Sequence, residues 1–167
     1  MVRALKIATK FLDRLSGPAE KGNPLKVKIS WVKPDFKSEA GEYFENPVTK
    51  DFFAKRGLIF KDKKELINFF DTGYFKVLNR EQLHKNFKNM SLTDEDFREE
   101  LKNPEYALSY GKMVSDLEET GKVTLPSPIT VNFDGLYYGF SGNRRMNLAF
   151  RYNMPIRFWV VDYKAGN

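Results

Sequence analysis

The chain has 167 residues, of which 41% are hydrophobic and 15% aromatic, and its formal net charge is +6. These values predict a folded protein of one domain, or a small domain with an elaboration, and they exclude a wholly disordered chain. The absence of cysteine excludes disulfides, thiolate catalysis and cysteine-ligated metals, and the positive charge favours anionic partners without choosing among nucleic acids, nucleotides and lipid surfaces.

Residues 3–15 carry apolar side chains at helical spacing, with charged residues between them. This pattern predicts an amphipathic helix docked on the core, and the alternative is a basic helix on a membrane surface or a polyanion. The apolar stretches are too short for a signal peptide or a membrane span, and we expect a cytoplasmic protein. A loop over 16–24 follows, and then a half-buried strand over 25–32, in which apolar and polar residues alternate.

The rest of the N-terminal region has one clear helix pattern. Proline, glycine and glutamate residues predict irregular structure over 33–49. Further along, Asp62 is suited to cap a short helix and Gly73 to stop it. We therefore expect residues 1–72 to form an N-terminal elaboration that packs on a core domain of residues 73–167.

From residue 74 onward, the predicted elements are typical of a small mixed sheet with flanking helices. Asn103 and Gly121 suit the two ends of a long helix, and Asp134-Gly135 suits a two-residue hairpin turn. This order of elements predicts an α/β (α+β) fold. The predicted elements are a strand over 74–79, helices over 91–101 and 103–121, strands over 129–133 and 136–140, a helix that runs to about Asn153, and a closing strand over 156–161.

A glycine and two adjacent arginines stand at the start of that last helix, in the sequence SGNRR. The first backbone N–H groups of a helix have no intrahelical acceptor, so the helix start favours an anion and disfavours cations. Gly142 lets a phosphate approach closely, and Ser141 and Asn143 are suited to cap the helix or to donate hydrogen bonds. Without an anionic partner, Arg144 and Arg145 should each destabilise the helix by roughly 0.3–1 kcal/mol. The expected partner is either a ligand phosphate, whose oxygens match the arginine forks, or a carboxylate of the protein.

This turn and its surroundings resemble those of the superfamily of ParB N-terminal domains and sulfiredoxins. In that superfamily a helix ending in glycine leads to an x-P-I-x-V strand, a hairpin, a G-x-R-R (ParB-like) or G-C-H-R (sulfiredoxin) turn that begins a helix, and a last P-I-x-x-x-V strand. The segment over 119–161, ETGKVTLPSPITVNFDGLYYGFSGNRRMNLAFRYNMPIRFWVV, matches these features in order and spacing. The resemblance covers residues 74–163 and implies a small α/β domain whose G-x-R-R turn holds nucleotide phosphates.

Members of this superfamily differ in function, and the chain departs from two of them. ParB proteins bind and hydrolyse CTP, sulfiredoxins use ATP for phosphoryl transfer to a cysteine sulfinic acid, some relatives phosphorylate free serine, and others are described as nucleases. The chain lacks the cysteine that sulfiredoxin chemistry needs, and it has Asn143 where ParB proteins usually have glutamate. It also ends at Asn167, shortly after the closing strand. We therefore expect neither a partition ParB nor a sulfiredoxin.

Five further residues are weaker candidates for a site. His84, in a loop that borders the nucleotide cleft in the resembling family, is a candidate acid/base or base-stacking group, and the alternative is an exposed or structural histidine. Glu118 and Glu119 end the long helix and are candidates for a magnesium ligand or a catalytic base, and the alternative is a solvated helix end. Arg151 and Arg157 are candidates for a secondary basic patch near the same anion.

The leading hypothesis is a nucleotide-binding protein that holds a nucleoside triphosphate, together with Mg²⁺, at the turn over 141–145. If the protein is an enzyme, the expected reaction is nucleotide hydrolysis or phosphoryl transfer. One alternative is a non-catalytic DNA- or RNA-binding, or nuclease-like, module that places the same arginines on backbone phosphates. Another is an interaction module that has lost its ligand, with both arginines paired to the protein's own carboxylates. The sequence assigns no catalytic base, metal ligand, base specificity or oligomeric state.

Overall fold

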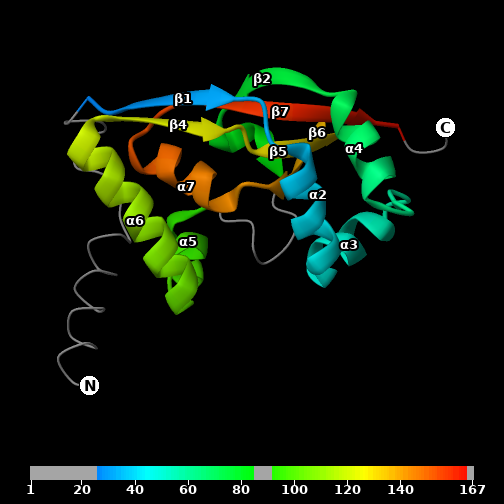
Figure 1. Cartoon of the computed structure of the whole chain (residues 1–167), viewed down its shortest axis with the longest axis horizontal. Coiled ribbons are helices and arrows are strands. Elements are labelled where there is room, and N and C mark those ends of the chain that lie inside the picture. Colours follow the sequence, from blue (N-terminus) through cyan, green and yellow to red (C-terminus); the bar gives the residue numbers. More distant parts are fainter. Residues whose placement is uncertain (1–25, 85–91, 165–167) are drawn as a thin grey trace.

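The computed structural model describes residues 26–84 and 92–164, and within them the chain has an α+β fold (Figure 1), which confirms the predicted fold class. The strands are β1 (Lys28–Val32), β2 (Tyr74–Leu78), β3 (Leu83–His84), β4 (Lys122–Pro126), β5 (Ile129–Phe133), β6 (Leu136–Ser141) and β7 (Ile156–Tyr163). The helices are α2 (Phe36–Glu45), α3 (Pro47–Ala54), α4 (Lys63–Asp71), the 3₁₀ turn η1 (Arg80–Gln82), α5 (Asp94–Glu100), α6 (Pro104–Thr120) and α7 (Asn143–Arg151). None of these described helices is long and apolar enough to cross a lipid bilayer. The helix predicted over 3–15 and the loop predicted over 16–24 lie outside the described residues.

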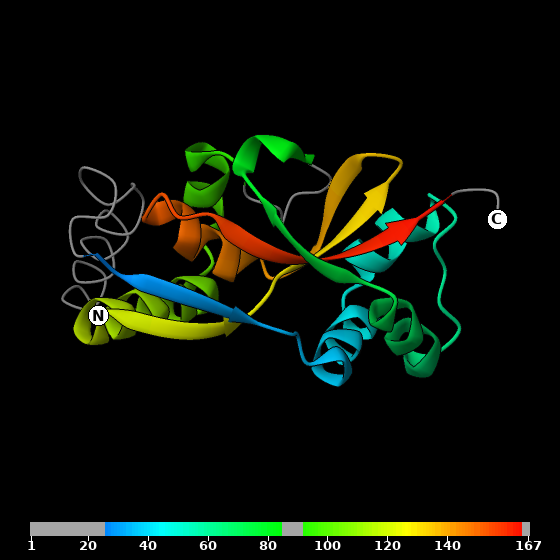
Figure 2. The same ribbon diagram turned by 90° about the horizontal axis from the view of Figure 1, so that it is seen from above.

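The strands form two sheets. The larger sheet has the order β2-β7-β5-β6-β3 and is mixed, because β7 runs parallel to β5 and β6 to β3, while the other neighbours are antiparallel. β1 and β4 form a separate parallel pair, in which Ile29 lies opposite Val123. Figures 1 and 2 show α5, α6 and α7 toward one end of the larger sheet and α2, α3 and α4 toward the other.

Several predicted element boundaries agree with the structure because short-range chemistry sets them. Asp62 accepts a backbone N–H at the start of α4, and Asn103 caps α6 immediately before Pro104. Gly121 ends α6 in the left-handed conformation, with a φ of 75°. The Asp134-Gly135 turn has positive φ at both residues, 51° and 95°, as a two-residue type I′ hairpin requires.

The prediction of irregular structure over 33–49 is wrong, because α2 and α3 occupy most of this segment. Asp35 caps α2 by accepting two backbone N–H groups of its first turn. Pro47 does not interrupt a helix but occupies the first turn of α3, which Asn46 caps. Pro47 therefore lies where one short helix ends and the next begins. The local sequence pattern does not distinguish such a junction from an irregular segment without helices.

Two strands of the structure have no counterpart among the predicted elements. β4 follows Gly121 directly and pairs with β1, and β3 is a two-residue strand beside β6. Each depends on pairing with a strand that is distant in the sequence, which local propensity does not reveal. The last predicted helix exists as α7, but it ends at Arg151 and not at about Asn153.

Two hydrophobic clusters cover opposite faces of β7. Phe158 and Val160 belong to the cluster that contains the buried residues of α6 and α7, whereas Trp159 belongs to the cluster formed with α2, α3 and α4. The alternation follows from the two-residue period of a strand. Because Phe53 and Phe70 are fully buried in the second cluster, the segment before residue 73 shares a core with the sheet. The domain division at residues 72 and 73 stays a prediction.

Candidate functional site

A cavity of about 540 Å³ lies between α2 and the turn that begins α7. α6 contributes Tyr106, Ser109 and Met113 to its lining, and β4 contributes Leu125. All five residues of the predicted phosphate site, 141–145, also line it. The structure therefore brings the predicted site residues to one hollow, whose opposite wall comes from the N-terminal segment.

Gly142 shapes the turn at which β6 passes into α7. Its φ of 94° lies in the left-handed region, and a Cβ atom there would stand 2.7 Å from the Cβ and 2.8 Å from the Cα of Pro128. Glycine alone meets both demands without strain. No side chain in the described ranges caps α7, and the first intrahelical bond runs from the Met146 N–H to the Gly142 carbonyl oxygen at 2.9 Å. The N-terminus of α7 therefore presents the partial positive charge that suits an anion.

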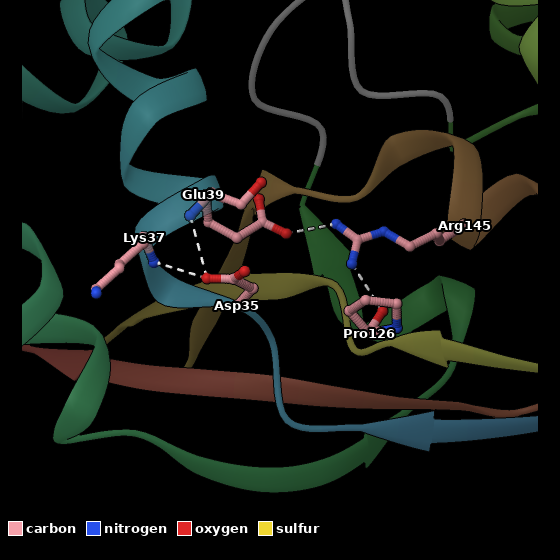
Figure 3. A network of polar contacts seen from close by, with 6 residues as sticks. Asp35, Lys37, Glu39, Pro126 and Arg145 are labelled. Atoms are coloured by element: carbon pink, nitrogen blue, oxygen red, sulfur yellow. Dashed lines mark hydrogen bonds and ion pairs between the residues drawn. The ribbon is translucent and has the colours of Figure 1, made fainter.

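Arg145 is the buried member of the arginine pair. Its Nη2 donates to Oε1 of Glu39 at 2.8 Å, and its Nη1 donates to the carbonyl oxygen of Pro126 at 2.7 Å (Figure 3). The side chains of this ion pair are only 16% and 8% exposed. Of the two kinds of partner that the sequence allows for Arg145, the structure has the protein carboxylate.

Arg144 and Ser141 have a different environment. Arg144 is exposed, its Nη1 donates to the Ser109 hydroxyl at 2.8 Å, and its guanidinium carbon lies 5.9 Å from the centre of the Tyr106 ring. Within residues 26–84 and 92–164, no carboxylate forms an ion pair with it. The Ser141 hydroxyl is buried and has no hydrogen-bond partner in the same ranges. Asn143 donates to the Tyr106 hydroxyl over a long 3.4 Å.

Four of the described lining residues are acidic, and none of them is among the site residues predicted from the sequence. Asp35 caps α2, Glu39 pairs with an arginine, and Glu42 and Glu100 complete the set. Among the described lining residues, the two arginines are the cationic ones. The four acidic and two basic residues of this described lining sum to a net charge of −2 when all six groups are ionised.

Burial and neighbouring charges shift the pKa values of two of these carboxyl groups. Partial burial, followed by the charge of Glu39, raises the pKa of Glu42, while the two arginines oppose this rise. Burial, followed by the charge of Asp96, raises the pKa of Glu100. Burial therefore disfavours the ionised form of these two carboxyl groups.

A signal for the α2 carboxylates exists in the sequence. Asp35 is a favourable N-cap, Glu39 and Glu42 stand three residues apart, and Tyr43 stands four residues after Glu39. Residues three and four apart share one face of a helix, so this pattern predicts both carboxylates beside a core aromatic. That Glu39 meets Arg145, 106 positions away, depends on the tertiary fold.

Three of the weaker candidate residues lie away from the cavity. His84 is exposed on β3, with its ring 5.3 Å from that of Tyr138. Glu119 is exposed near the end of α6, and the guanidinium of Arg157 lies 3.9 Å from the centre of the Phe75 ring. None of the three is among the residues that line the cavity.

Glu118 and Arg151 form a contact between α6 and α7. Glu118 accepts a hydrogen bond from the Tyr152 hydroxyl at 3.0 Å, and its carboxylate lies 4.0 Å from Nη2 of Arg151. Neither residue lines the cavity. The structure thus gives this pair a place in the packing of the two helices and does not join it to the turn over 141–145.

The chain matches no protein-family model, and no curated protein or solved structure matches it at a significant level. The resemblance to the ParB and sulfiredoxin superfamily therefore stays a prediction based on residues 74–163. In the part of the chain that the structure describes, no group of three or more His, Cys, Asp or Glu side chains is placed to hold a metal ion.

Proposed function

We propose that the chain binds a nucleoside triphosphate in the cavity between α2 and α7, with the phosphates at the first turn of α7. The observation that carries the proposal is the N-terminus of α7, which no described side chain caps and which opens on a cavity of about 540 Å³ beside the exposed Arg144. Sites for small molecules typically have volumes of about 300–1,000 Å³, so a nucleotide is of suitable size.

Three kinds of donor favour phosphate at this turn. The backbone N–H groups of the first turn point out of the helix with partial positive charge. Arg144 supplies a guanidinium whose present partner is the neutral Ser109 hydroxyl, which a phosphate oxygen can replace. The buried Ser141 hydroxyl, without a hydrogen-bond partner in the described ranges, supplies a third donor. Gly142 supplies the left-handed backbone, with a φ of 94°, that the turn into α7 requires.

The remainder of the lining suits the base and ribose of a nucleotide. Tyr43, Phe140, Met113 and Leu125 give the cavity an apolar portion next to the phosphate end. Aromatic and aliphatic walls with a few convergent polar groups are the usual composition of a small-molecule site. The resemblance to ParB and sulfiredoxin proteins, whose G-x-R-R or G-C-H-R turn holds nucleotide phosphates, supports the same ligand class.

The reaction that fits such a site is nucleotide hydrolysis or phosphoryl transfer. In both, negative charge on the transferred group is stabilised by prearranged donors, and Arg144, the N–H groups of α7 and the Ser141 hydroxyl are the candidate donors among the described residues. Arg145 would act indirectly, because its guanidinium already binds Glu39 and the Pro126 carbonyl oxygen.

The buried ion pair of Arg145 and Glu39 favours a second candidate function. A guanidinium that a carboxylate of the same chain already neutralises is expected in an interaction module that has lost its ligand. A nucleic-acid backbone is a weaker candidate for this cavity, because four carboxylates share its lining with the two arginines.

The test is a thermal-shift series with ATP, CTP, GTP, UTP and a short DNA duplex, each with Mg²⁺. We expect one or more nucleotides to raise the melting temperature, since a ligand at 100 times its Kd stabilises a fold by about 2.7 kcal/mol. The shift should largely disappear in Arg144→Ala and persist in Arg157→Ala, a matched control whose guanidinium lies over Phe75 and outside the cavity.

The other outcomes separate the candidates. A shift with every nucleotide and with DNA that falls steeply with salt identifies a nucleic-acid-binding module. The absence of any shift in the wild-type chain contradicts nucleotide binding and favours the interaction module. A nucleotide shift that Arg144→Ala leaves intact contradicts the placement of the phosphates at α7.

A further inference from the structure

The charge of the cavity conflicts with a bare polyphosphate. Among the residues that the structure describes, four carboxyl groups and two guanidiniums line it, which leaves two uncompensated negative charges when all six are ionised. One guanidinium, that of Arg145, is already bound to Glu39 at 2.8 Å. A triphosphate would add several negative charges beside Glu42 and Glu100, and like charges in a partly buried site repel strongly. The ligand therefore needs positive charge beyond that of the two described arginines.

A second observation, at Glu39, indicates where the additional positive charge would lie. Its side chain is more than nine-tenths buried and lines the cavity, and one oxygen, Oε1, binds Arg145. The other oxygen, Oε2, is buried and finds no hydrogen-bond partner among the described residues. Figure 3 shows the Glu39 carboxylate facing Arg145 from α2. An unsatisfied buried carboxylate oxygen is costly, and a cation or a donor from a ligand would remove that cost.

The donor set on α2 suits a hard divalent cation. Glu39 and Glu42 are three residues apart and therefore lie on one face of α2, and both line the cavity. Carboxylate oxygens are the ligands that Mg²⁺ and Mn²⁺ prefer. Mg²⁺ is usually held by one or two carboxylates together with substrate phosphates and water, so two protein ligands are enough when a phosphate is present and too few when it is absent.

We propose that Glu39 and Glu42 of α2 hold a divalent cation that enters together with the ligand's phosphates and links α2 to the first turn of α7. This inference rests on the proposed function, because the phosphates supply the remaining ligands. It assigns to the N-terminal segment, which lies outside the resemblance, the cation-binding half of the site. Glu118 and Glu119, the sequence candidates for a magnesium ligand, do not line the cavity and play no part in it.

Two ligands that meet in one site should bind with reciprocal coupling. The probe is inorganic triphosphate, which avoids the question of the base. Isothermal titration of the full chain in Mg²⁺ and in EDTA measures the coupling. We expect wild-type triphosphate affinity to be at least about tenfold higher in Mg²⁺ than in EDTA, within the range typical of coupled sites.

Variants locate the cation. Glu42→Gln should reduce the ratio of the two affinities to near one, and Glu45→Gln, an exposed position on α2 outside the cavity lining, should leave it unchanged. Glu39→Gln keeps an oxygen acceptor for Arg145 while removing the charge, and it should act as Glu42→Gln does. A second measurement uses Mn²⁺ with triphosphate, which should broaden the backbone amide resonances of α2 and of the first turn of α7 more than those of α3 and α4 in NMR spectra.

The outcomes distinguish the two proposals. If triphosphate and all the nucleotides fail to bind in either buffer, the proposed function fails and the cation site falls with it. If binding is equally tight in Mg²⁺ and EDTA, phosphate binding stands and the cation site is overturned. A Mg²⁺ dependence that survives Glu42→Gln and Glu39→Gln, or broadening that avoids α2, likewise overturns the assignment to α2.

Discussion

At Gly142, the absence of a side chain decides how closely the strand β6, the helix α7 and Pro128 approach one another. The backbone has a φ of 94°, and the position that a Cβ would occupy lies within 3 Å of two atoms of Pro128. Conformation and space therefore both require glycine, and each requirement contributes separately to stability.

We predict that Gly142→Ala destabilises the fold more than Gly121→Ala. Both glycines have positive φ, 94° and 75°, which costs an alanine about 1–2 kcal/mol. A Cβ at Gly121 meets no atom of the described residues within 4 Å, whereas one at Gly142 meets the Pro128 Cα at 2.8 Å, which adds about 1–3 kcal/mol. Urea denaturation measures the difference, and equal losses would show that the turn relaxes away from Pro128.

Neighbouring residues of the same type have opposite roles at this turn. Arg145 is buried against Glu39 and the Pro126 carbonyl oxygen, while Arg144 is exposed and donates to the neutral Ser109 hydroxyl among the described residues. Breaking a buried ion pair by removing one partner typically costs about 3–5 kcal/mol, whereas an exposed arginine contributes little to stability. For this reason Arg144 is the residue whose substitution tests ligand binding without a large change in folding.

At the scale of elements, α2 forms the side of the cavity that lies opposite the first turn of α7. The helix and its N-cap supply three of the four described carboxyl groups of the cavity, Asp35, Glu39 and Glu42, and the helix packs beside α4. Its first turn is fixed by Asp35, whose carboxylate accepts the N–H groups of Lys37 at 3.1 Å and Ser38 at 3.3 Å. A ten-residue helix is marginal by itself, so its cap and its packing both matter.

We predict that Asp35→Ala lowers the free energy of unfolding by about 0.5–2 kcal/mol, because the cap is lost, and that Asp35→Asn changes it little. Asparagine accepts the same backbone N–H groups, so it is the matched control. Chemical denaturation gives the free energies, and hydrogen exchange should show the loss of protection concentrated in α2. Similar losses for alanine and asparagine would indicate that the charge of Asp35, and not its capping bond, stabilises the helix.

At the scale of the whole molecule, the two hydrophobic clusters make the N-terminal segment part of the core. Ile129, Val131 and Val161 are fully buried, and they pack in the cluster that α2, α3 and α4 complete. The pairing of β1 with β4 joins the same segment to the second half of the chain at another place.

We predict that a fragment of residues 73–167 does not fold cooperatively. Without α2, α3 and α4, the sheet would expose a face that includes Ile129, Val131 and Phe140. Exposure of each such side chain to water lowers the free energy of unfolding by about 1.5–3 kcal/mol. Near-UV circular dichroism and thermal denaturation of the fragment, beside the full chain, measure this. A sharp thermal transition in the fragment would contradict the prediction and support an independent domain that begins at residue 73.

The sequence by itself determined the elements that short-range chemistry specifies. The caps Asp62 and Asn103, the stop at Gly121 and the hairpin at Asp134-Gly135 all lie where their residue types predict. The α+β class and the location of an anion-suited turn before α7 follow from the same local patterns. These features need only neighbouring residues, so one sequence is enough to predict them.

Only the tertiary structure decided what faces that turn. The pairing of β1 with β4 and the meeting of Glu39 with Arg145 join residues roughly a hundred positions apart, and no local pattern encodes which distant partner a strand or a side chain meets. In the sequence the two arginines stand next to each other without a nearby carboxylate, whereas the fold places carboxyl groups of α2, its N-cap and α5 in the same cavity. The electrostatic potential at a site depends on all the charged groups that the fold brings close to it. The residues of the turn alone therefore do not predict the charge of the cavity.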